Sequence, residues 1–181
     1  MAVELQTLSN WLNNMEIKHH MDTKDSKIFS GGNNDGNKII VKIKLTENGE
    51  MFQIYSNLVI DDDLNELKIK DHEHAGLVLQ QMLKINYEEK FGTWEFDPTD
   101  GEVRFAVEIP LEDAVMTENQ FQRIFKHVFN SADNFGILTK ILETGELPAD
   151  EEDSITDLLE AMLLSLKQKK AEIARQDEDG I

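Results

Sequence analysis

Hydrophobic residues recur every three or four positions in four stretches of the chain, a spacing typical of helices with one apolar face. These stretches cover residues 3–15, 71–87, 117–142 and 155–174. Asp71 is the expected N-cap of the second helix, and Thr117 with Gln120 forms a predicted capping box at the third. We expect Gly136 to bend the third helix and Gly145 to end it.

A period of two, typical of strands with one buried face, separates these stretches. It is weak in 16–30 and clear in 39–45, 51–60, 91–97 and 102–109. Asn48-Gly49 and Pro98…Gly101 are turn sequences, which indicates two antiparallel hairpins, and the Gly- and Asn-rich segment 31–37 is expected to be a loop. The predicted fold class is α+β, in the order α-β-β-β-α-β-β-α-α, with helices packed on an antiparallel sheet of about five strands.

The same patterns predict which side chains are buried. The expected core includes Trp94, Phe105, Val107, Phe121, Phe125 and Leu159. The second face of the sheet is expected to be polar and solvated, because it would carry Lys42, Lys44, Gln53, Ser56, Arg104, Ala106 and Glu108.

The acidic stretch near the C-terminus suggests a division of the chain. Residues 1–146 are expected to form one α+β domain, and 147–181 an acidic linker with an amphipathic helix packed on that domain or on its dimer mate. The apolar band of this helix is wider than one coiled-coil seam, which makes it a candidate partner-binding surface. The candidate partner-binding residues are Ile155, Leu158, Leu159, Met162, Leu163 and Leu166.

Composition narrows the function classes. The 181 residues include 18 basic and 36 acidic side chains, a formal net charge of −18, and this charge disfavours binding to nucleic acid. The chain has no cysteine, which removes disulfides, thiol nucleophiles and cysteine-bound metal centres. Nine Phe and two Trp provide a core that an intrinsically disordered acidic chain would lack.

The apolar runs are too short to span a membrane. The N-terminal residues lack the basic and apolar regions of a signal peptide, so we expect a cytoplasmic protein.

Candidate metal sites are weak. The Asp71-His72-Glu73-His74 sequence contains two histidines, but residues two apart on a helix face different sides and cannot share one ion. His19 and His20 are adjacent and would point apart on a strand. The aspartates at 61–63 and 97–100 do not match an EF-hand loop. We therefore expect no metal and no cofactor.

No nucleophile elbow, phosphate-binding loop or dinucleotide fingerprint is present in the sequence, so we do not expect an enzyme. The run 143–160 contains eight carboxylates and no basic residue, and it is either a solvated linker or a contact for a basic protein.

The stretch Gly92-Thr93-Trp94-Glu95-Phe96-Asp97 … Asp100-Gly101-Glu102-Val103-Arg104-Phe105 … Ile109-Pro110-Leu111 … Met116-Thr117 … Gln120-Phe121 resembles the bacterial YbjN family. The resemblance covers about 91–142, and it implies the fold of type III secretion chaperones. The family has been described as sensory-transduction regulators, and its fold relatives are small, acidic, dimeric proteins that bind other proteins. The helix at 155–174 is an addition to that pattern.

Together these features favour a non-catalytic protein-binding module, a chaperone-like or regulatory adaptor that forms a homodimer and contacts another protein. Two alternatives remain open at this point: an enzyme with an unrecognised carboxylate and histidine site, and an acidic mimic of nucleic acid.

The first prediction concerns self-association. Since the apolar surplus lies in the C-terminal stripe from Ile155 to Leu166, we expect a homodimer to which this stripe contributes. Light scattering at micromolar concentrations should give twice the 20.7 kDa chain mass. A mass of one chain would contradict the dimer, and a dimer that persists after truncation at Asp150 would contradict the role of the helix.

Overall fold

The computed structural model describes residues 3–34, 36–60, 65–149 and 162–163. The chain divides into two compact units, Met1–Glu146 and Leu147–Ile181. The architecture described below is that of the first unit.

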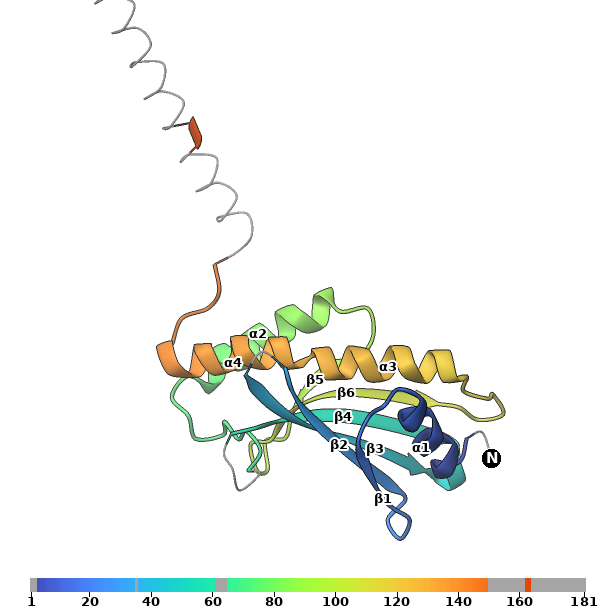
Figure 1. Ribbon diagram of the computed structural model, residues 1–181. Coiled ribbons are helices and arrows are strands. Elements are labelled where there is room, and N and C mark those ends of the chain that lie inside the picture. Colours follow the sequence, from blue (N-terminus) through green and yellow to red (C-terminus); the bar gives the residue numbers. More distant parts are fainter. Residues whose placement is uncertain (1–2, 35, 61–64, 150–161, 164–181) are drawn as a thin grey trace, which may run out of the picture. The chain divides into compact units, whose positions relative to one another are not determined.

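One antiparallel sheet of six strands organises the first unit (Figure 1), with the spatial order β1-β2-β3-β4-β6-β5. Its strands are β1 (His19–Asp22), β2 (Lys27–Asn34), β3 (Asn37–Thr46), β4 (Met51–Val59), β5 (Thr93–Phe96) and β6 (Val103–Pro110). The short strands β1 and β5 form the two edges of the sheet.

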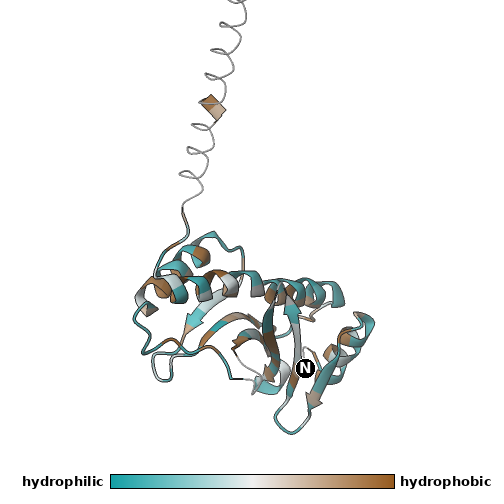
Figure 2. Ribbon diagram, turned by 60° about the vertical axis from the view of Figure 1, so that its left-hand side comes forward, coloured by the Kyte–Doolittle hydropathy of each residue, from teal (hydrophilic) through white to brown (hydrophobic). Residues whose placement is uncertain are grey.

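The helices pack on one face of this sheet, and Figure 2 shows hydrophobic positions on the elements that face each other. They are α1 (Leu5–Asn14), α2 (Ala75–Glu88), α3 (Glu118–Asn130) and α4 (Ala132–Thr144). Aromatic rings join the two layers: Phe121 of α3 lies 6.2 Å from Phe52 of β4, and Phe135 of α4 lies 4.6 Å from Trp94 of β5, between ring centroids.

The predicted fold class is confirmed, because the protein is α+β with helices on an antiparallel sheet. The predicted core is confirmed where it is described: Trp94, Phe105, Val107, Phe121 and Phe125 are all buried. Leu159 lies outside the described residues.

The sheet has one strand more than expected, because the segment from 16 to 34 forms two strands, β1 and β2, in place of one. Residues 31–34 are not a loop: Gly31 pairs with Ile40, and Gly32 pairs with Ile39. A Cβ atom on Gly32 would lie 2.7 Å from the Phe129 ring. Glycine is needed here for close packing against α3, and not for a turn.

The third predicted helix is divided at Ser131, and not bent at Gly136. The Ser131 hydroxyl donates to the Val128 carbonyl oxygen at 2.6 Å and lies 2.7 Å from the hydroxyl of Ser56. Ser56 therefore faces the helices and is buried, which corrects its predicted place on the solvated face. Because the division depends on a partner from β4, helix propensity alone could not reveal it.

Helix α2 begins at Ala75, later than expected, and Asp71 does not cap it. Its buried face also differs from the one that the apolar residues Ala75, Val78, Leu79, Met82 and Leu83 predict. Gln81 and Ile85 are buried, whereas Leu83 is 71% exposed.

The burial of Phe125 leads to a stability prediction. Phe125 is 2% exposed, so Phe125→Ala should lower the free energy of unfolding by about 3–5 kcal/mol in urea denaturation. Tyr87→Ala is the matched control, because Tyr87 is 92% exposed and its loss should cost less than about 0.5 kcal/mol. Equal losses in the two variants would contradict the assigned face of α3.

Candidate functional site

The partner-binding residues predicted from the sequence belong to the second unit. Met162 and Leu163 are each 57% exposed. Ile155, Leu158, Leu159 and Leu166 lie outside the described residues, so their proposed role stays a prediction.

The predicted metal candidates do not converge on one point. His72 lies in the turn before α2, where its Nδ1 accepts a hydrogen bond from the His74 main-chain N–H at 3.1 Å. The rings of His72 and His74 are 5.5 Å apart. His19 is held by Ser9 and by the Ile17 carbonyl oxygen. Across the described residues, no group of three or more potential ligands could hold a metal ion. The aspartates at 61–63 lie outside the described residues.

The most prominent binding feature is the outer edge of β6. Strand β5 pairs with β6 from Phe96↔Val103 to Thr93↔Ala106 and goes no further. On its other side, β6 stays paired with β4 as far as Met51↔Pro110. Residues Val107–Pro110 therefore belong to the sheet on one side and form an open edge on the other.

The orientation of the main-chain groups on this edge follows from the neighbouring hydrogen bonds. The Glu102 carbonyl oxygen accepts a hydrogen bond from the main-chain N–H of Asp97 on the β5 side. The Leu111 N–H donates to the main-chain carbonyl oxygen of Glu50 on the β4 side. Since main-chain groups alternate along a strand, the N–H and C=O of Glu108 point to the open edge. Pro110 has no N–H, which limits the edge to a short segment.

Gly92 ends the pairing of β5. Its φ of 90° turns the chain away from the direction of the strand. A Cβ atom at this position would lie 2.5 Å from Cζ of Phe105 and 3.0 Å from Cγ2 of Val107. Both the dihedral angle and the packing therefore require glycine at the point where the edge of β6 opens.

An apolar groove of 610 Å³ lies beside the open edge. We call it the β6–α3 groove. Its apolar lining includes Phe91, Ala106, Val107, Ile109, Leu111, Val115, Met116 and Ile124. Glu95, Glu108, Gln120 and Arg123 supply the polar side chains of its rim. An apolar floor with a few polar groups at the rim is typical of binding sites.

The start of α3 forms one wall of the groove. The predicted capping box is confirmed: Gln120 N–H donates to the Thr117 hydroxyl at 3.3 Å, and Thr117 N–H donates to Oε1 of Gln120 at 2.8 Å. This local interaction fixes where the helix begins and holds Met116, which is buried, at the end of the groove.

A carboxylate and a histidine hold the opposite wall. Nε2 of His127 lies 2.8 Å from the Phe91 carbonyl oxygen and 3.4 Å from Oε2 of Glu89. The His127 ring packs on the Phe91 ring, with 4.2 Å between centroids. Both neighbours of Nε2 are acceptors, so Nε2 carries the proton and donates it. His127 therefore positions Phe91 at the groove, and its Nε2 is not free to act as a base.

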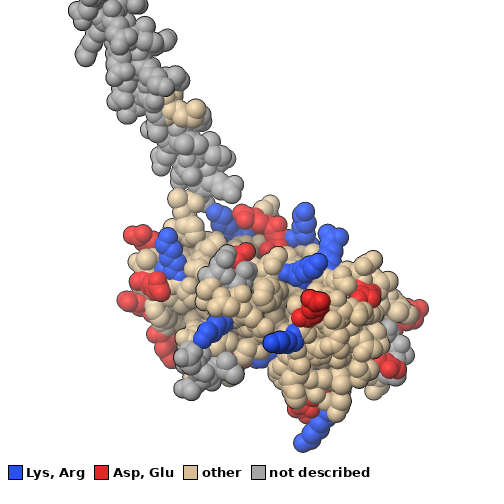
Figure 3. Space-filling model, in the orientation of Figure 1, with Lys and Arg blue, Asp and Glu red and all other residues tan. Residues whose placement is uncertain are grey.

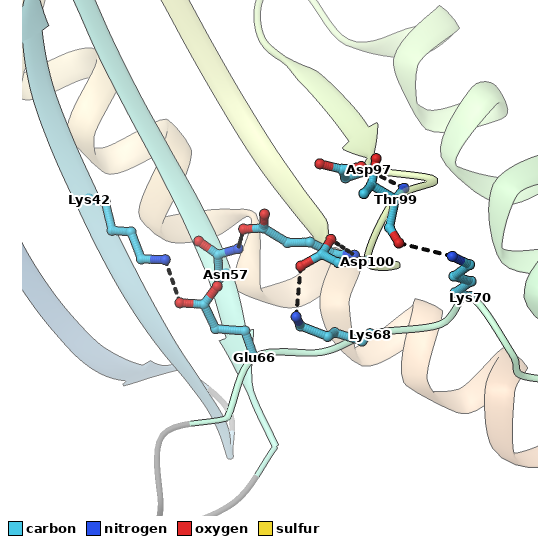
Figure 4. A network of polar contacts seen from close by, with 9 residues as sticks. Lys42, Asn57, Glu66, Lys68, Lys70, Asp97, Thr99 and Asp100 are labelled. Atoms are coloured by element: carbon cyan, nitrogen blue, oxygen red, sulfur yellow. Dashed lines mark hydrogen bonds and ion pairs between the residues drawn. The ribbon is translucent and has the colours of Figure 1, made fainter.

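A network of polar contacts holds the segment after β4, residues 65–70, in place against the sheet and the β5–β6 turn (Figure 4). Glu66 pairs with Lys42 of β3, and Lys68 pairs with Asp100 at 2.7 Å. Lys70 donates to the Thr99 carbonyl oxygen at 2.9 Å. These charged groups already have partners within the protein, which indicates a structural role.

The hydrogen bond between Lys68 and Asp100 shifts the pKa of both groups. It raises the pKa of Lys68, and together with the main-chain N–H of Glu102 it lowers the pKa of Asp100. This pair stabilises the folded state near neutral pH, and its contribution is lost as the pH falls through the lowered pKa of Asp100. Both side chains are exposed, so the contribution is small.

The distribution of charge bears on the idea of a nucleic-acid mimic. Figure 3 shows acidic and basic side chains interspersed over one face of the first unit, with no continuous acidic row on that face. A mimic of a phosphate backbone would place carboxylates at regular spacing along one face.

The sequence patterns did not reveal the groove, because its parts are far apart in the chain. Gly92 directly before a strand was a possible signal, and Pro110 at the end of β6 was another. Neither residue indicates by itself that one strand is shorter than its neighbour.

Comparison with known proteins finds structures of similar fold. The chain is similar to YbjN from E. coli at 12% identity, covering 80% of this chain and 93% of that one, with a TM-score of 0.49. It is also similar to a chain of the ExsC–ExsE complex at 14% identity, covering 72% of this chain and 89% of that one, with a TM-score of 0.46. YbjN, whose family the sequence resembles, is one of these structures.

No family model and no curated protein matches the sequence. Within the described residues, none of the helices combines the length and the apolar character needed to cross a membrane.

The contacts of Gly92 lead to a second stability prediction. Gly92→Ala should destabilise the protein by about 1–3 kcal/mol more than Gly36→Ala, measured by urea denaturation. The comparison isolates the clash with Phe105, because both glycines have positive φ while a Cβ atom on Gly36 would meet nothing within 4 Å. Equal losses would show that the packing around Gly92 tolerates a side chain.

Proposed function

We propose that the protein is a non-catalytic binding module that holds an extended segment of another protein in the β6–α3 groove. The segment adds a strand to the open edge of β6. The observation that carries this proposal is the coincidence of unpaired main-chain groups at Glu108 with an apolar groove along the same four residues. Strand addition of this kind supplies hydrogen bonds from the main chain and selectivity from the side-chain pockets.

The pleat of the sheet determines the pattern of the partner segment. Val107 and Ile109 point to the helices, as their partners Ile54 and Phe52 do, whereas Glu108 points to the opposite face. An added strand continues this alternation. Every second side chain of the partner therefore enters the apolar groove beneath α3, and the others lie on the face that carries Glu108.

Charge favours basic residues at those outer positions. Residues 1–146 contain 26 acidic and 14 basic side chains, a formal charge of −12. Glu108 is exposed and accepts a hydrogen bond from Nε2 of Gln53 at 2.7 Å. A partner that alternates apolar and basic residues would match both the groove and its rim, and the overall charge would speed its association.

The proposal of a non-catalytic role rests on the contacts that the polar side chains near the groove already make within the protein. Glu89 and His127 form a carboxylate and histidine pair beside Phe91, and both are engaged in holding Phe91. Their arrangement supports a positioning role for the pair.

The second unit is a further proposed contact. We propose that the stripe of Ile155, Leu158, Leu159, Met162, Leu163 and Leu166 serves in homodimer formation, as the amphipathic pattern of the sequence predicts. Met162 and Leu163 are exposed, which is compatible with this role.

The groove is tested with an acetylated, fluorescently labelled peptide of eight residues that alternates Val and Lys. We expect saturable binding by fluorescence anisotropy, because this peptide matches the pleat and the charge of the site. A peptide of four Val followed by four Lys has the same composition and should bind at least about tenfold more weakly. Equal affinities would show that charge alone causes binding and would overturn the proposal.

A substitution on the edge tests the main-chain contact. Glu108→Pro removes the N–H that points to the open edge and leaves the hydrogen bonds between β6 and β4 in place. It should weaken binding of the alternating peptide about fivefold or more relative to Glu108→Thr, which removes the same charge and keeps the N–H. Unfolding curves for the two variants check that both are folded, and equal affinities of the folded variants would contradict strand addition.

A further inference from the structure

A polar pocket of 560 Å³ lies where α2, the segment after it, α3 and α4 come together. We call it the α2–α4 pocket. Its lining includes Gln81, Ile85, Glu88, Glu89, Lys90, Phe91, Arg123, His127, Asn130, Asn134 and Ile137. Figure 1 shows α2 beside α4, which follows directly after α3 in the helix layer.

Gln81 is the unusual residue of this pocket. It lies on the buried face of α2 and is 9% exposed. Among the described residues, no hydrogen-bond partner is found for its side-chain amide, which borders the pocket. The amide atoms of Gln81 are not among the fully buried, unpartnered polar atoms of the described residues, so this amide is open to the pocket and can pair with a ligand there.

Two more amides line the same pocket. Asn130 is the last residue of α3, and Asn134 follows four positions later in α4, across the division at Ser131. Within the part of the chain that the structure describes, neither side chain has a hydrogen-bond partner. The three amides each offer donors and an acceptor, which is the combination needed to pair with peptide groups.

The charges around the pocket balance. Glu88, Glu89, Lys90 and Arg123 all line the pocket, so the lining carries equal numbers of acidic and basic side chains and has no strong preference for an anion or a cation. A neutral ligand that is rich in hydrogen-bonding groups fits this lining better than a charged one, and the main chain of a polypeptide is such a ligand.

The pocket adjoins the β6–α3 groove, because Phe91 and Arg123 line both. β5 runs antiparallel to β6 and starts at Thr93, opposite Ala106. A partner strand that is also antiparallel to β6 would run toward the same point. Its C-terminal end would reach Phe91, at the boundary between the groove and the pocket.

We propose that the α2–α4 pocket binds the main chain of the partner segment that follows the added strand. Gln81, Asn130 and Asn134 pair with its peptide groups, so recognition in this part of the site does not depend on the partner's side chains. This inference rests on the proposed function of the β6–α3 groove.

The test extends the alternating Val and Lys peptide at its C-terminus with Gly-Ser-Gly-Ser, a sequence with a complete main chain and small side chains. We expect the extension to raise affinity about five- to tenfold in fluorescence anisotropy, as one or two hydrogen bonds would. The same extension at the N-terminus should give no gain. An extension of four sarcosines, which lack N–H groups, should lose most of the gain.

Protein variants locate the contact. Gln81→Met keeps the length of the side chain and removes its hydrogen-bonding groups, so it should abolish the gain from the extension while the unextended peptide binds as before. Gln80→Met is the matched control, because Gln80 is the exposed neighbour on α2 and its loss should leave the gain intact. Asn134→Ala should reduce the gain without the need to alter a buried residue.

The outcomes separate the two proposals. If the unextended peptide binds and the C-terminal extension gives no gain, or if the gain survives in both Gln81→Met and Asn134→Ala, the assignment of the pocket is overturned and the groove stands. If the unextended peptide does not bind, the proposed function fails and this inference fails with it.

Discussion

The contact between the Gly92 backbone and the Phe105 ring is the constraint on which the candidate site depends. Gly92 lies so close to Phe105 that no side chain fits, and its positive φ turns the chain away from β6. If β5 ran four residues further back, it would pair with Val107–Pro110 and fill the groove. The open edge is therefore a consequence of local packing at one glycine.

Contacts within the helix layer hold the residues that line the site in place. His127 ties the segment after α2 to α3 through the Phe91 carbonyl oxygen, so Phe91 forms a wall and does not collapse into the groove. The hydroxyls of Ser131 and Ser56 meet where α3 ends and α4 begins. The α2–α4 pocket, which the Gln81 side chain also lines, adjoins the groove at Phe91 and Arg123.

In the proposed function, charge affects the rate of association, whereas the paired strand determines which segment binds. The formal charge of −18 acts over a distance of about 8 Å at physiological salt and raises the rate at which a basic partner arrives. It does not distinguish one basic segment from another. The alternation of the pleat at Val107, Glu108 and Ile109 supplies that distinction, because only a segment with the matching period places its apolar residues in the groove.

The sequence by itself determined the fold class, the hairpins around Asn48-Gly49 and Gly101, and the capping box of Thr117, since these depend on residues that are close together in the chain. It also identified Phe105 and Phe125 as core residues by periodicity. Only the tertiary structure decided the features that join distant segments.

One of those features is the division between α3 and α4 at Ser131, which involves a contact with β4. Another is that residues 31–34 form part of a strand, because they pair with β3 and pack against Phe129. The open edge of β6 is a third, because the unequal lengths of neighbouring strands arise from packing around Gly92. Periodicity reports which face of an element is buried, but it carries no information about which segment lies opposite. For that reason the sequence indicated a protein-binding module, while the place where a partner could bind emerged from the fold.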